Sequence, residues 1–378
     1  MTDEKKTQIP DAQAIAEGAE VTKEMVQEIK DQIAHYCTLE FSPYELQWLE
    51  INLPWIHRDY LDFLRYWHPR REEICVTDND SCGLSIAAYG TWLNTSMYEI
   101  AILAIVNEVY FAFKYGAGAK LAEFKQLTED HIGQLTNNKF DIGTFSEFGM
   151  RRRYSRAAQD YLIGSLLFAR SDGHLPGFVG TSNVFLARKF GIKAVGTQAH
   201  EFIMCVGQGN HKHNPAYSNW YSLDAWVKEY GILNGIALTD TIGTDVFIRD
   251  FNLTYATLFS GVRHDSGDPI KWGTKIITHY KDLGIDPRTK TLLFSDSLNL
   301  EKAHDIKKHF EGQCKVAFGI GTFWSNPLPD ALNIVMKVTE CNGSPVAKLS
   351  DVEGKGMCKD AEYVEYLKRA IDWRLTHE

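Results

Sequence analysis

Seven short polar clusters between Glu147 and Thr322 carry the residues of this chain that are best suited to chemistry. Each cluster ends a short apolar run, precedes a helical pattern and is rich in Gly, Ser, Thr, Asp or Arg. In chain order the clusters span residues 147–153, 179–183, 195–201, 238–241, 262–268, 294–297 and 319–322. Small residues at such positions let backbone N–H groups and helix N-termini approach an anion closely. The clusters therefore predict a protein that handles phosphate.

The order of the surrounding segments indicates how the clusters come together. Strand-like runs at 192–195, 235–238, 291–294, 316–318 and 332–338 alternate with loops and helical stretches. This alternation is typical of a (β/α) barrel, in which the active site lies at the carboxyl ends of the strands. We therefore expect an irregular barrel whose polar clusters meet at one face.

Helix starts and buried faces can be placed around several clusters. Ala158, Leu162 and Leu166 share one face of a helix expected over 155–169. Side chains that cap helix N-termini follow the strand-like runs. The expected caps are Ser182 or Asn183, Asp268 ahead of Pro269, and Ser297 or Asn299.

The remainder of the chain is expected to form a second domain. Residues 141–332 are expected to make the barrel, and residues 1–140 together with 333–378 an accessory α/β domain. Within it, residues 1–35 are expected to be a helical or partly disordered lead-in. A long apolar helix is expected from Ser96 to Lys114.

Composition argues against several classes of protein. Apolar residues make up 44% and charged residues 24% of the chain, as in ordinary globular proteins. The formal net charge of -9 argues against a nucleic-acid partner. The 7 cysteines are far apart, which favours reduced thiols over disulfides or a zinc site. No apolar run is expected to approach the length of a membrane span and residues 1–30 do not resemble a signal peptide, so a cytoplasmic protein is expected.

The clusters, in this order, resemble the motifs of the nicotinate phosphoribosyltransferase family, and the resemblance runs from about Tyr44 to the end of the chain. It is carried by Glu147-Phe148-Gly149-x-Arg151-Arg152, Gly180-Thr181-Ser182-Asn183, Gly196-Thr197-x-Ala199-His200-Glu201, Gly261-x-Arg263-His264-Asp265-Ser266-Gly267-Asp268-Pro269, Phe318-Gly319-x-Gly321-Thr322 and Glu340-Cys341-Asn342-Gly343-x-Pro345-Val346-Ala347-Lys348-Leu349-Ser350.

The resemblance implies both a fold and a reaction. The fold is that of type II phosphoribosyltransferases, an irregular (β/α) barrel with an accessory α/β domain. Nicotinate and phosphoribosyl pyrophosphate would give nicotinate mononucleotide and pyrophosphate, a step of NAD biosynthesis and salvage. ATP would be a co-substrate, hydrolysed to ADP and phosphate through a phosphohistidine. Mg²⁺ would be bound by substrate phosphates, with no metal held by the protein alone. A homodimer with shared active sites is also implied.

One motif of the family has no match. An Asp-x-Asp-x-Tyr-Lys segment opens its members and contributes a stacking aromatic across a dimer interface, and residues 1–40 contain nothing similar. The expectation is either a start upstream of Met1 or a catalytically impaired homologue kept as a binding or partner subunit. A phosphoribosyltransferase for nicotinamide or quinolinate is a further alternative. Ser182 and the phosphohistidine motif favour nicotinate, and quinolinate would need more cationic groups.

The resemblance assigns nicotinate to the first two clusters. Phe148 would stack on the pyridine ring, and Arg151 would bind the carboxylate in bidentate fashion. Ser182 would add a hydroxyl where a relative using the amide would prefer an acidic residue. Arg152 and Arg153 are left open between a solvated basic edge and phosphate steering.

His200 is the residue that the resemblance makes the phospho-acceptor. A ring nitrogen of histidine can accept a phosphoryl group and release it readily to water, which suits energy coupling. Without the motif, a lone histidine at a strand end is more often structural. Glu201 could orient the imidazole or face solvent, and neither is favoured.

The cluster at 262–268 opens a helix, so its N–H groups can receive phosphate oxygens. The residues expected to meet the phosphates of phosphoribosyl pyrophosphate or ATP are Arg263, His264, Ser266 and Gly267. Asp265 is expected to join His200 in catalysis by contacting ribose hydroxyls or a Mg²⁺-bound water, and Asp268 to be a plain N-cap.

The last clusters resemble a cradle for the 5′-phosphate. Its expected members are Ser295, Asp296, Gly319, Gly321 and Thr322. Asp240 could bind ribose or only close a turn, and ribose binding is favoured. The chain has no Walker A sequence, so any use of ATP must go through the barrel site. His211 and His213 are expected to lie in an exposed loop rather than in a metal site.

Overall fold

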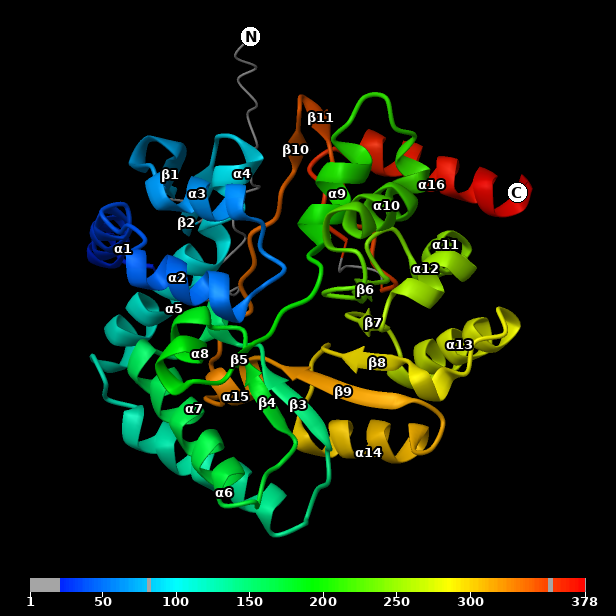
Figure 1. Cartoon of the computed structure of the whole chain (residues 1–378). Coiled ribbons are helices and arrows are strands. Elements are labelled where there is room, and N and C mark those ends of the chain that lie inside the picture. The colour runs from blue at the N-terminus through cyan, green and yellow to red at the C-terminus, as the bar shows by residue number, and fades with distance from the viewer. Residues whose placement is uncertain (1–20, 80–82, 353–355, 378) are drawn as a thin grey trace.

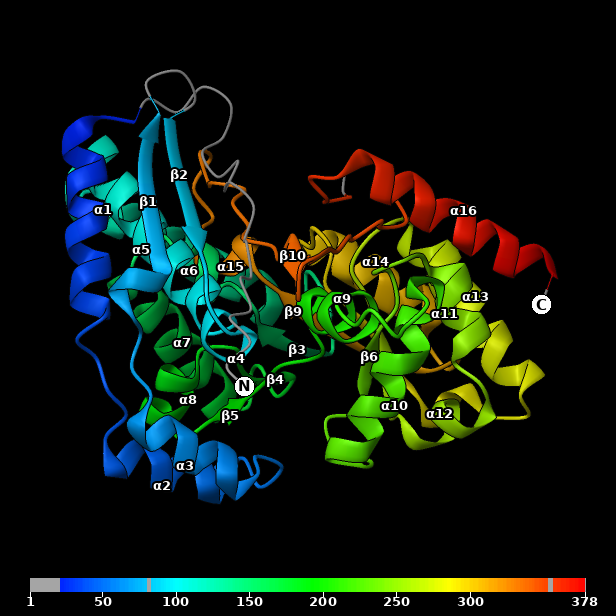
Figure 2. The ribbon, with the colours of Figure 1, turned by 90° about the horizontal axis from the view of Figure 1, so that it is seen from above.

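The computed structural model describes residues 21–79, 83–352 and 356–377. Figure 1 shows a sheet at the centre, with the N-terminal helices (dark blue to light blue) at the upper left and the C-terminal helix (red) at the upper right. The view from above in Figure 2 separates the same two parts, with the C-terminal helix on the side opposite the N-terminal elements. Residues 1–20 of the segment that lacks the Asp-x-Asp-x-Tyr-Lys motif lie outside the described residues.

The N-terminal part contains helices and a hairpin. Its helices are α1 Lys23–Tyr36, α2 Pro43–Asn52, α3 Arg58–Tyr66, α4 Trp92–Thr95, α5 Tyr98–Tyr115 and α6 Leu121–Thr136. The hairpin pairs β1 Ile74–Asn79 with β2 Gly83–Ala88 in antiparallel fashion. Helix α5 confirms the long apolar helix expected near Ser96.

The expectation that no apolar run could span a membrane was wrong. Among the described residues, Trp92–Tyr115 is one helical stretch long and apolar enough to do so, with a mean hydropathy of 1.4. Half of this window is buried inside the protein, where Ile102, Val106 and Phe111 join the main core. Burial against the rest of the protein thus accounts for its apolar composition.

Seven parallel strands form the central sheet. They are β3 Thr144–Glu147, β4 Phe178–Thr181, β5 Lys193–Ala194, β6 Ile236–Leu238, β7 Gly261–His264, β8 Thr291–Phe294 and β9 Lys315–Ile320. Their spatial order is β5-β4-β3-β9-β8-β7-β6. The first and last strands along the chain, β3 and β9, are therefore neighbours, and the sheet is open between its edge strands β5 and β6. This curled, incompletely closed sheet confirms the expected irregular barrel.

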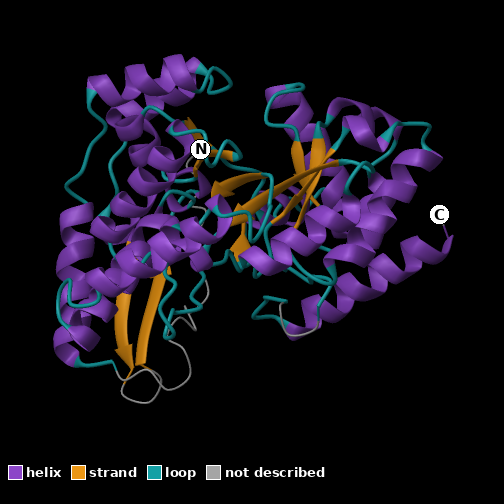
Figure 3. Ribbon diagram, turned by 90° about the horizontal axis from the view of Figure 1, so that it is seen from below, coloured by secondary structure: helices purple, strands orange, loops and turns teal. Residues whose placement is uncertain are grey.

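Helices surround the strands, as Figure 3 shows from below. Those that follow β3 are α7 Arg156–Ser171, α8 Val184–Phe190, α9 His200–Gln208, α10 Ser218–Tyr230, α11 Thr244–Asp250, α12 Leu253–Leu258, α13 Pro269–Asp282, α14 Leu300–Phe310 and α15 Thr322–Ser325. The expected helix over 155–169 is therefore confirmed as α7. Short 3₁₀ turns lie at Arg71–Glu73 (η1), Met150–Arg152 (η2), Pro215–Tyr217 (η3) and Pro287–Thr289 (η4).

The helix starts follow the predicted capping chemistry. Ser155 caps α7, and Asp268 caps α13 by accepting the backbone N–H groups of residues 270 and 271. Between the paired alternatives, Asn183 rather than Ser182 caps α8, and Asn299 rather than Ser297 caps α14. Each cap satisfies backbone donors that the first helical turn leaves unpaired.

The open edge of the sheet is partly closed by one side chain. Gln198, which follows β5, accepts the backbone N–H of Leu238 in β6 through Oε1 at 3.1 Å. An unpaired edge N–H in the protein interior would be costly, and the glutamine amide replaces the missing strand partner. This contact joins the end of β5 to the end of β6, the place where the polar clusters meet.

The expected strand at 332–338 is not formed, because no neighbouring strand pairs with it. Leu332, Ile334, Met336 and Val338 are nevertheless buried at alternate positions, which accounts for the strand-like pattern of the sequence. Beyond it lie β10 Glu340–Cys341, β11 Ser344–Pro345 and α16 Ala361–His377. The assignment of residues 333–378 to an accessory domain stays a prediction.

The C-terminal segment lies along the barrel helices. Ala347 exchanges two hydrogen bonds with the side chain of Gln208 in α9, and the Leu349 N–H bonds to the Thr241 carbonyl at 2.8 Å. Arg374 of α16 pairs with buried Asp250 of α11. These contacts place residues 347–351 beside the carboxyl ends of β6 and β7.

Candidate active site

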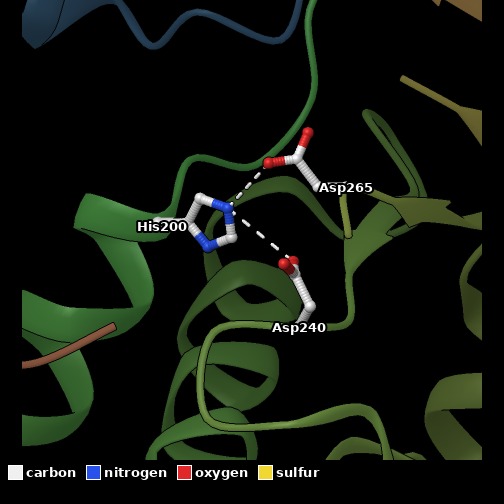
Figure 4. Close-up of side chains that lie close together, drawn as sticks. All are labelled: His200, Asp240 and Asp265. Carbon is white, nitrogen blue, oxygen red and sulfur yellow. Dashed lines mark hydrogen bonds and ion pairs between the residues drawn. The ribbon is translucent and has the colours of Figure 1, made fainter. Parts of the chain in front are cut away.

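His200, the first residue of α9, is buried where three barrel elements meet. Its Nδ1 lies 2.9 Å from Thr241 Oγ1, and its Nε2 lies 3.0 Å from Asp265 Oδ2. Asp240 Oδ1 is 3.7 Å from Nε2. Figure 4 shows both carboxylates on the same side of the imidazole, facing one ring nitrogen, Nε2. The structure thus brings together three of the predicted site residues.

Lys348 places a cation in the centre of this cluster. Its Nζ lies 2.9 Å from His200 Nε2, 3.3 Å from Asp240 Oδ2 and 3.8 Å from Asp265 Oδ2. The lysine reaches this position because the tail that carries it runs beside β6. A buried ammonium among two carboxylates offsets their mutual repulsion.

His200, Asp240 and Asp265 also have the geometry of a metal site. One ligand atom from each lies within 4.8 Å of the others. The Lys348 ammonium is already in contact with the same atoms, so the charge that a divalent ion would neutralise has a protein partner. Asp240 Oδ1 is buried and has no hydrogen-bond partner in the described part of the chain.

Arg263 and Asp265, two residues apart at the end of β7, form the second half of the cluster. Arg263 NH2 donates to Asp265 Oδ1 at 2.5 Å, NH1 to Thr197 Oγ1 at 2.8 Å and Nε to Ser295 Oγ at 2.8 Å. Ser295 in turn donates to Asp265 Oδ1 at 2.9 Å. The guanidinium therefore links the exits of β5, β7 and β8.

The protonation states follow from burial and these charges. Burial lowers the pKa of His200 below its ordinary value, and Lys348 acts in the same direction, although Asp240 and Asp265 oppose the shift. Burial alone would raise the pKa of Asp265, but Arg263, His200 and Lys348 hold it well below its usual range. A neutral imidazole beside ionised carboxylates results, which leaves a ring lone pair available for chemistry.

His264 lies apart from this polar cluster. It is 1% exposed, and its ring packs against Trp272 and Phe294. Successive side chains of a strand point to opposite sides. Arg263 and Asp265 therefore face the cluster, whereas His264 faces helix α13.

Ser266 and Gly267 continue the turn into α13. Ser266 Oγ donates to Asp240 Oδ2 at 2.6 Å, and Ser350 of the tail donates to Ser266 Oγ at 3.0 Å. Gly267 has a φ of 88°, a left-handed conformation that side chains disfavour. The turn is thus fixed from both sides before the helix begins at Pro269.

The predicted nicotinate residues lie at the exit of β3, beside β9. The Phe148 ring lies against Gly319, where a Cβ would be only 2.5 Å from the ring. The backbone N–H of Phe148 donates to the Ile320 carbonyl. Glycine at 319 is therefore required by the close approach of the ring. Gly321 lies against the Phe148 carbonyl, and Thr322 begins α15.

Arg151 contacts a carboxylate of the N-terminal part. Its NH1 donates to Glu99 Oε1 of α5 at 2.9 Å, while the side chain stays 32% exposed. Arg152 instead donates to the Ile334 carbonyl, and Arg153 pairs with Glu108. Burial lowers the pKa of Arg152 to about 10. The three consecutive arginines thus have three different surroundings.

The remaining predicted residues lie around these two groups. Ser182 is half-buried and its N–H bonds to the Glu147 carbonyl, next to Phe148. Asp296 follows β8, where its side chain accepts from Ser297 Oγ. Glu201 is half-buried and accepts a hydrogen bond from Trp92 Nε1 at 2.6 Å, and no hydrogen bond joins it to the His200 imidazole. Burial raises its pKa to about 7, and Glu99 adds to the shift.

Several residues of the site were not found from the sequence. Lys348, Thr241, Thr197 and Glu99 contact the predicted residues, yet none was assigned a role. Lys348 lay within the recognised tail motif, which was the available signal. Glu99 gave none, since it lies on the apolar helix α5. The loop residues His211 and His213 bond to the carbonyls of residues 342 and 206.

Comparison with known proteins agrees with this geometry. Residues 144–374 match the nicotinate phosphoribosyltransferase (NAPRTase) family, and residues 17–107 match the NAPRTase N-terminal domain. A nicotinate phosphoribosyltransferase of Acidovorax sp. (strain JS42) is 41% identical over 353 residues, covering 92% of this chain and 87% of that protein. One of Citrobacter koseri is 41% identical over 358 residues, covering 91% and 85%.

Solved structures give the same result for the fold. The nicotinate phosphoribosyltransferase of Porphyromonas gingivalis has a TM-score of 0.87 at 31% identity, covering 98% of this chain and 94% of that one. That of Vibrio cholerae has a TM-score of 0.87 at 33% identity, covering 97% and 88%. Together with the arrangement of the polar clusters, these matches show that the chain belongs to the nicotinate phosphoribosyltransferase family.

Proposed function

We propose that this enzyme transfers the phosphoribosyl group of phosphoribosyl pyrophosphate to nicotinate, giving nicotinate mononucleotide and pyrophosphate for NAD biosynthesis and salvage. The family match supports the two substrates and the reaction. The transferred anomeric carbon passes through an oxocarbenium-like state between the ring nitrogen of nicotinate and the leaving pyrophosphate. The enzyme must therefore hold an aromatic acid and a polyphosphate on opposite sides of a ribose.

The single observation that carries the proposal is the surroundings of His200. A buried, neutral imidazole lies next to the ammonium of Lys348, and Asp240 and Asp265 border it. Such a ring nitrogen is a nucleophile, and the adjacent cation can receive phosphoryl oxygens. We assign His200 as the phospho-acceptor and Asp265 as the carboxylate that orients it.

ATP enters as co-substrate at the same place. A His200 ring nitrogen attacks the terminal phosphorus of ATP, the P–N bond forms, and the P–O bond to ADP breaks. Water later cleaves the P–N bond and gives free phosphate, so ATP is consumed as ADP and phosphate. Both ring nitrogens have protein partners within 3.0 Å, so phosphorylation replaces one of these contacts.

Mg²⁺ is proposed to arrive with the substrate phosphates and to neutralise their charge. The carboxylates of Asp240 and Asp265 are the protein groups that could reach such an ion or its bound water. Arg263, Ser266 and the backbone at Gly267 would meet phosphate oxygens. His264 is now a weaker candidate for phosphate binding, because its ring is packed away from the cluster.

At the other end of the site, Phe148 is proposed to stack on the pyridine ring and Arg151 to bind its carboxylate. Arg151 is 32% exposed, and in the described part of the chain its guanidinium donates to Glu99 alone, which leaves donors for the substrate. Ser182, beside Glu147, is proposed to add a hydroxyl. Asp240 for ribose, and Ser295, Asp296, Gly319, Gly321 and Thr322 for the 5′-phosphate, complete the proposed contacts.

Three further parts of the proposal concern the setting of the enzyme. It is proposed to be cytoplasmic, to form a homodimer with shared active sites, and to need neither a membrane nor a nucleic acid. The resemblance of the motifs motivates the dimer, and composition motivates the rest. Size-exclusion chromatography with light scattering tests the dimer: a monomer at micromolar concentration would contradict it.

Turnover of purified protein tests the proposed reaction. Nicotinate, phosphoribosyl pyrophosphate, Mg²⁺ and ATP are supplied, and nicotinate mononucleotide is followed by chromatography. Formation of the mononucleotide with release of ADP is expected. Turnover of nicotinamide or quinolinate, with none of nicotinate, would contradict the proposed substrate and assign the other compound instead. No turnover by the folded protein would favour a binding or partner subunit.

A further inference from the structure

A cavity of about 430 Å³ lies among helices α10, α11 and α16, and the proposed reaction has no use for it. Figure 1 shows these three helices together at the upper right of the molecule. None of the residues that line the cavity belongs to the candidate active site, which lies at the strand exits. The volume falls within the range of small-molecule sites, about 300–1,000 Å³. The side chains on its wall therefore indicate what it could bind.

Three aromatic rings line this cavity, and they differ in how far their faces are covered. Tyr217 lies under the guanidinium of Arg374, whose central carbon is 3.8 Å from the ring centroid. Tyr221 stacks with His213 at a centroid distance of 3.7 Å. Trp220 is 40% exposed and makes an edge contact with Tyr221, with centroids 5.2 Å apart. The Trp220 indole is therefore the surface on which a flat ring could stack.

The carboxylate and amide oxygens of the lining side chains are engaged within the protein. Asp250 pairs with Arg374, which is 7% exposed and also donates to a backbone carbonyl at 2.9 Å. Asn214 and Asn252 each cap a helical turn, so their Oδ1 atoms accept backbone N–H groups at 3.1 and 3.0 Å. A ligand that relies on donating hydrogen bonds would have to compete with these contacts.

Donors on the same wall are left without a partner in residues 21–79, 83–352 and 356–377. Arg249 NH1 donates to the Leu375 carbonyl at 3.2 Å, whereas its Nε and NH2 form no hydrogen bond there. The same holds for Trp220 Nε1 and the Tyr221 hydroxyl. Two guanidinium groups against one carboxylate give the lining one positive charge, in a chain with a net charge of -9. Unused donors and a positive charge favour an anionic ligand.

We propose that this cavity binds a nucleoside monophosphate, with its base stacked on Trp220 and its phosphate bound by Arg249. An aromatic ring and an anion in one ligand use both features of the wall, whereas either alone uses one. Stacking recognises the face of a base and not its edge, so the site accepts different bases. The site is separate from the strand exits at which the substrates of the proposed reaction are expected to bind.

Two simpler occupants compete with a nucleotide. Inorganic phosphate needs only the Arg249 guanidinium, and an uncharged nucleoside needs only the Trp220 ring. Titrations of the full-length protein with AMP, adenosine and inorganic phosphate, followed by calorimetry, separate the three cases. We expect AMP to bind more tightly than either of the other two compounds.

The variants Trp220→Ala and Arg249→Gln test the two contacts, and neither side chain is buried, so both variants should fold. For Trp220→Ala we expect the Kd for AMP to rise about 5- to 150-fold, the range for stacking of one base. For Arg249→Gln we expect a rise of about 10- to 150-fold, the range for a charge-assisted hydrogen bond. Phe168→Ala and Arg288→Gln are the matched controls, because both side chains are exposed elsewhere on the surface. The controls should leave the Kd unchanged.

AMP could also occupy the place of ATP in the candidate active site, so the bound nucleotide has to be located. Photolabelling of the unaltered protein with 8-azido-AMP, followed by peptide mapping, provides this. We expect label on residues 214–221 or 249–252, and excess AMP should prevent it. Label confined to the strand exits, such as the peptide that contains His200, would overturn the proposal.

Three titration results would also overturn the proposal. The first is no binding of AMP at millimolar concentration. The second is equal affinity for AMP and for phosphate or adenosine, which would remove either the base or the phosphate from recognition. The third is an unchanged Kd for AMP in both Trp220→Ala and Arg249→Gln, which would place the nucleotide elsewhere. Binding is measured here without turnover, so each of these results is independent of the proposed reaction.

Discussion

The two ends of the proposed site differ in how completely their charges are paired. At the phosphoryl end, Arg263, Asp265, His200 and Lys348 contact one another, and Arg263 alone donates to three side chains. At the pyridine end, Arg151 donates to Glu99 and its side chain stays 32% exposed. The phosphoryl end draws on loops after β5, β6, β7 and β8, whereas the pyridine end joins β3 to the N-terminal part. The charged side chains of the phosphoryl end are thus paired with one another, whereas Arg151 at the pyridine end is partly exposed.

This difference in charge pairing suggests that the phosphoryl end serves catalysis and the pyridine end serves substrate selection. Preformed dipoles and charges stabilise developing charge without reorganising during the reaction, which suits phosphoryl transfer. Unfilled donors instead favour the ligand that fills them, which suits selection of one substrate. Substitutions at the phosphoryl end should therefore lower kcat and ATP coupling, and substitutions at the pyridine end should raise the KM for nicotinate.

The largest effect is expected for His200→Ala. Without the imidazole there is no acceptor for the phosphoryl group, so labelling of the protein by ATP with a radioactive terminal phosphate should disappear and ATP should no longer stimulate turnover. Intact-protein labelling after a brief chase measures this directly. His174→Ala is the matched control, since this histidine is exposed in a turn. Label that persists in His200→Ala would place the phosphohistidine elsewhere.

Asp265→Asn should have the next largest effect. The change removes the anion that pairs with Arg263 and lies against His200, and breaking one partner of a buried ion pair costs about 3–5 kcal/mol. We expect kcat/KM to fall at least about 100-fold and the melting temperature to fall as well. Steady-state kinetics and thermal unfolding measure the two losses.

Asp268→Asn is the control for Asp265→Asn in the same turn. Asp268 only caps α13, and asparagine caps a helix about as well. Its kcat/KM should stay near the wild-type value. Equal losses in both variants would mean that the turn as a whole, rather than the Asp265 charge, matters.

The fold and the phosphoryl end were the parts best predicted from the sequence. Each of the seven clusters begins in or just after one of strands β3 to β9, because in parallel βα units the polar residues that end a strand all meet at one edge. The cap Asp268 was predicted from its position ahead of Pro269, whereas Ser155 was expected only as a helix start and was not predicted as a cap. Where two neighbours could cap, as with Ser182 and Asn183, the sequence alone did not decide.

Residues that reach the site from distant segments could not be predicted. Glu99 and Lys348 lie outside the seven clusters, and the packing of α5 and of the tail against the barrel brings them there. The strand expected at 332–338 shows the same limit. Alternating burial depends on a core on one side, whereas a strand also needs a backbone partner, and the hydrophobic pattern reports only the first.

Arg151→Ala is expected to show the behaviour of the pyridine end. Loss of a charge-assisted hydrogen bond of about 1.5–3 kcal/mol should raise the KM for nicotinate about 10- to 150-fold. The KM for ATP and label incorporation at His200 should change little, because the phosphoryl end keeps its contacts. Kinetics with each substrate varied in turn measures the split, with exposed Arg288→Ala as control. A loss of labelling equal to the loss of nicotinate affinity would mean that the two ends are not separable.

The smallest expected effect concerns pH and tests the phosphoryl end without any substitution. An imidazole is nucleophilic only when neutral, and burial lowers the pKa of His200 below its ordinary value of 6.5. Phosphorylation should therefore lose half of its rate at a pH below 6.5, and at pH 6.5 more than half of the rate should remain. Rates of label incorporation between pH 5 and 8 at saturating ATP locate this midpoint. A midpoint above 6.5 would mean that Asp240 and Asp265, which stabilise the protonated ring, outweigh the effects of burial and Lys348 on the pKa of His200. The charges around His200 would then favour the protonated imidazolium, which is not a nucleophile.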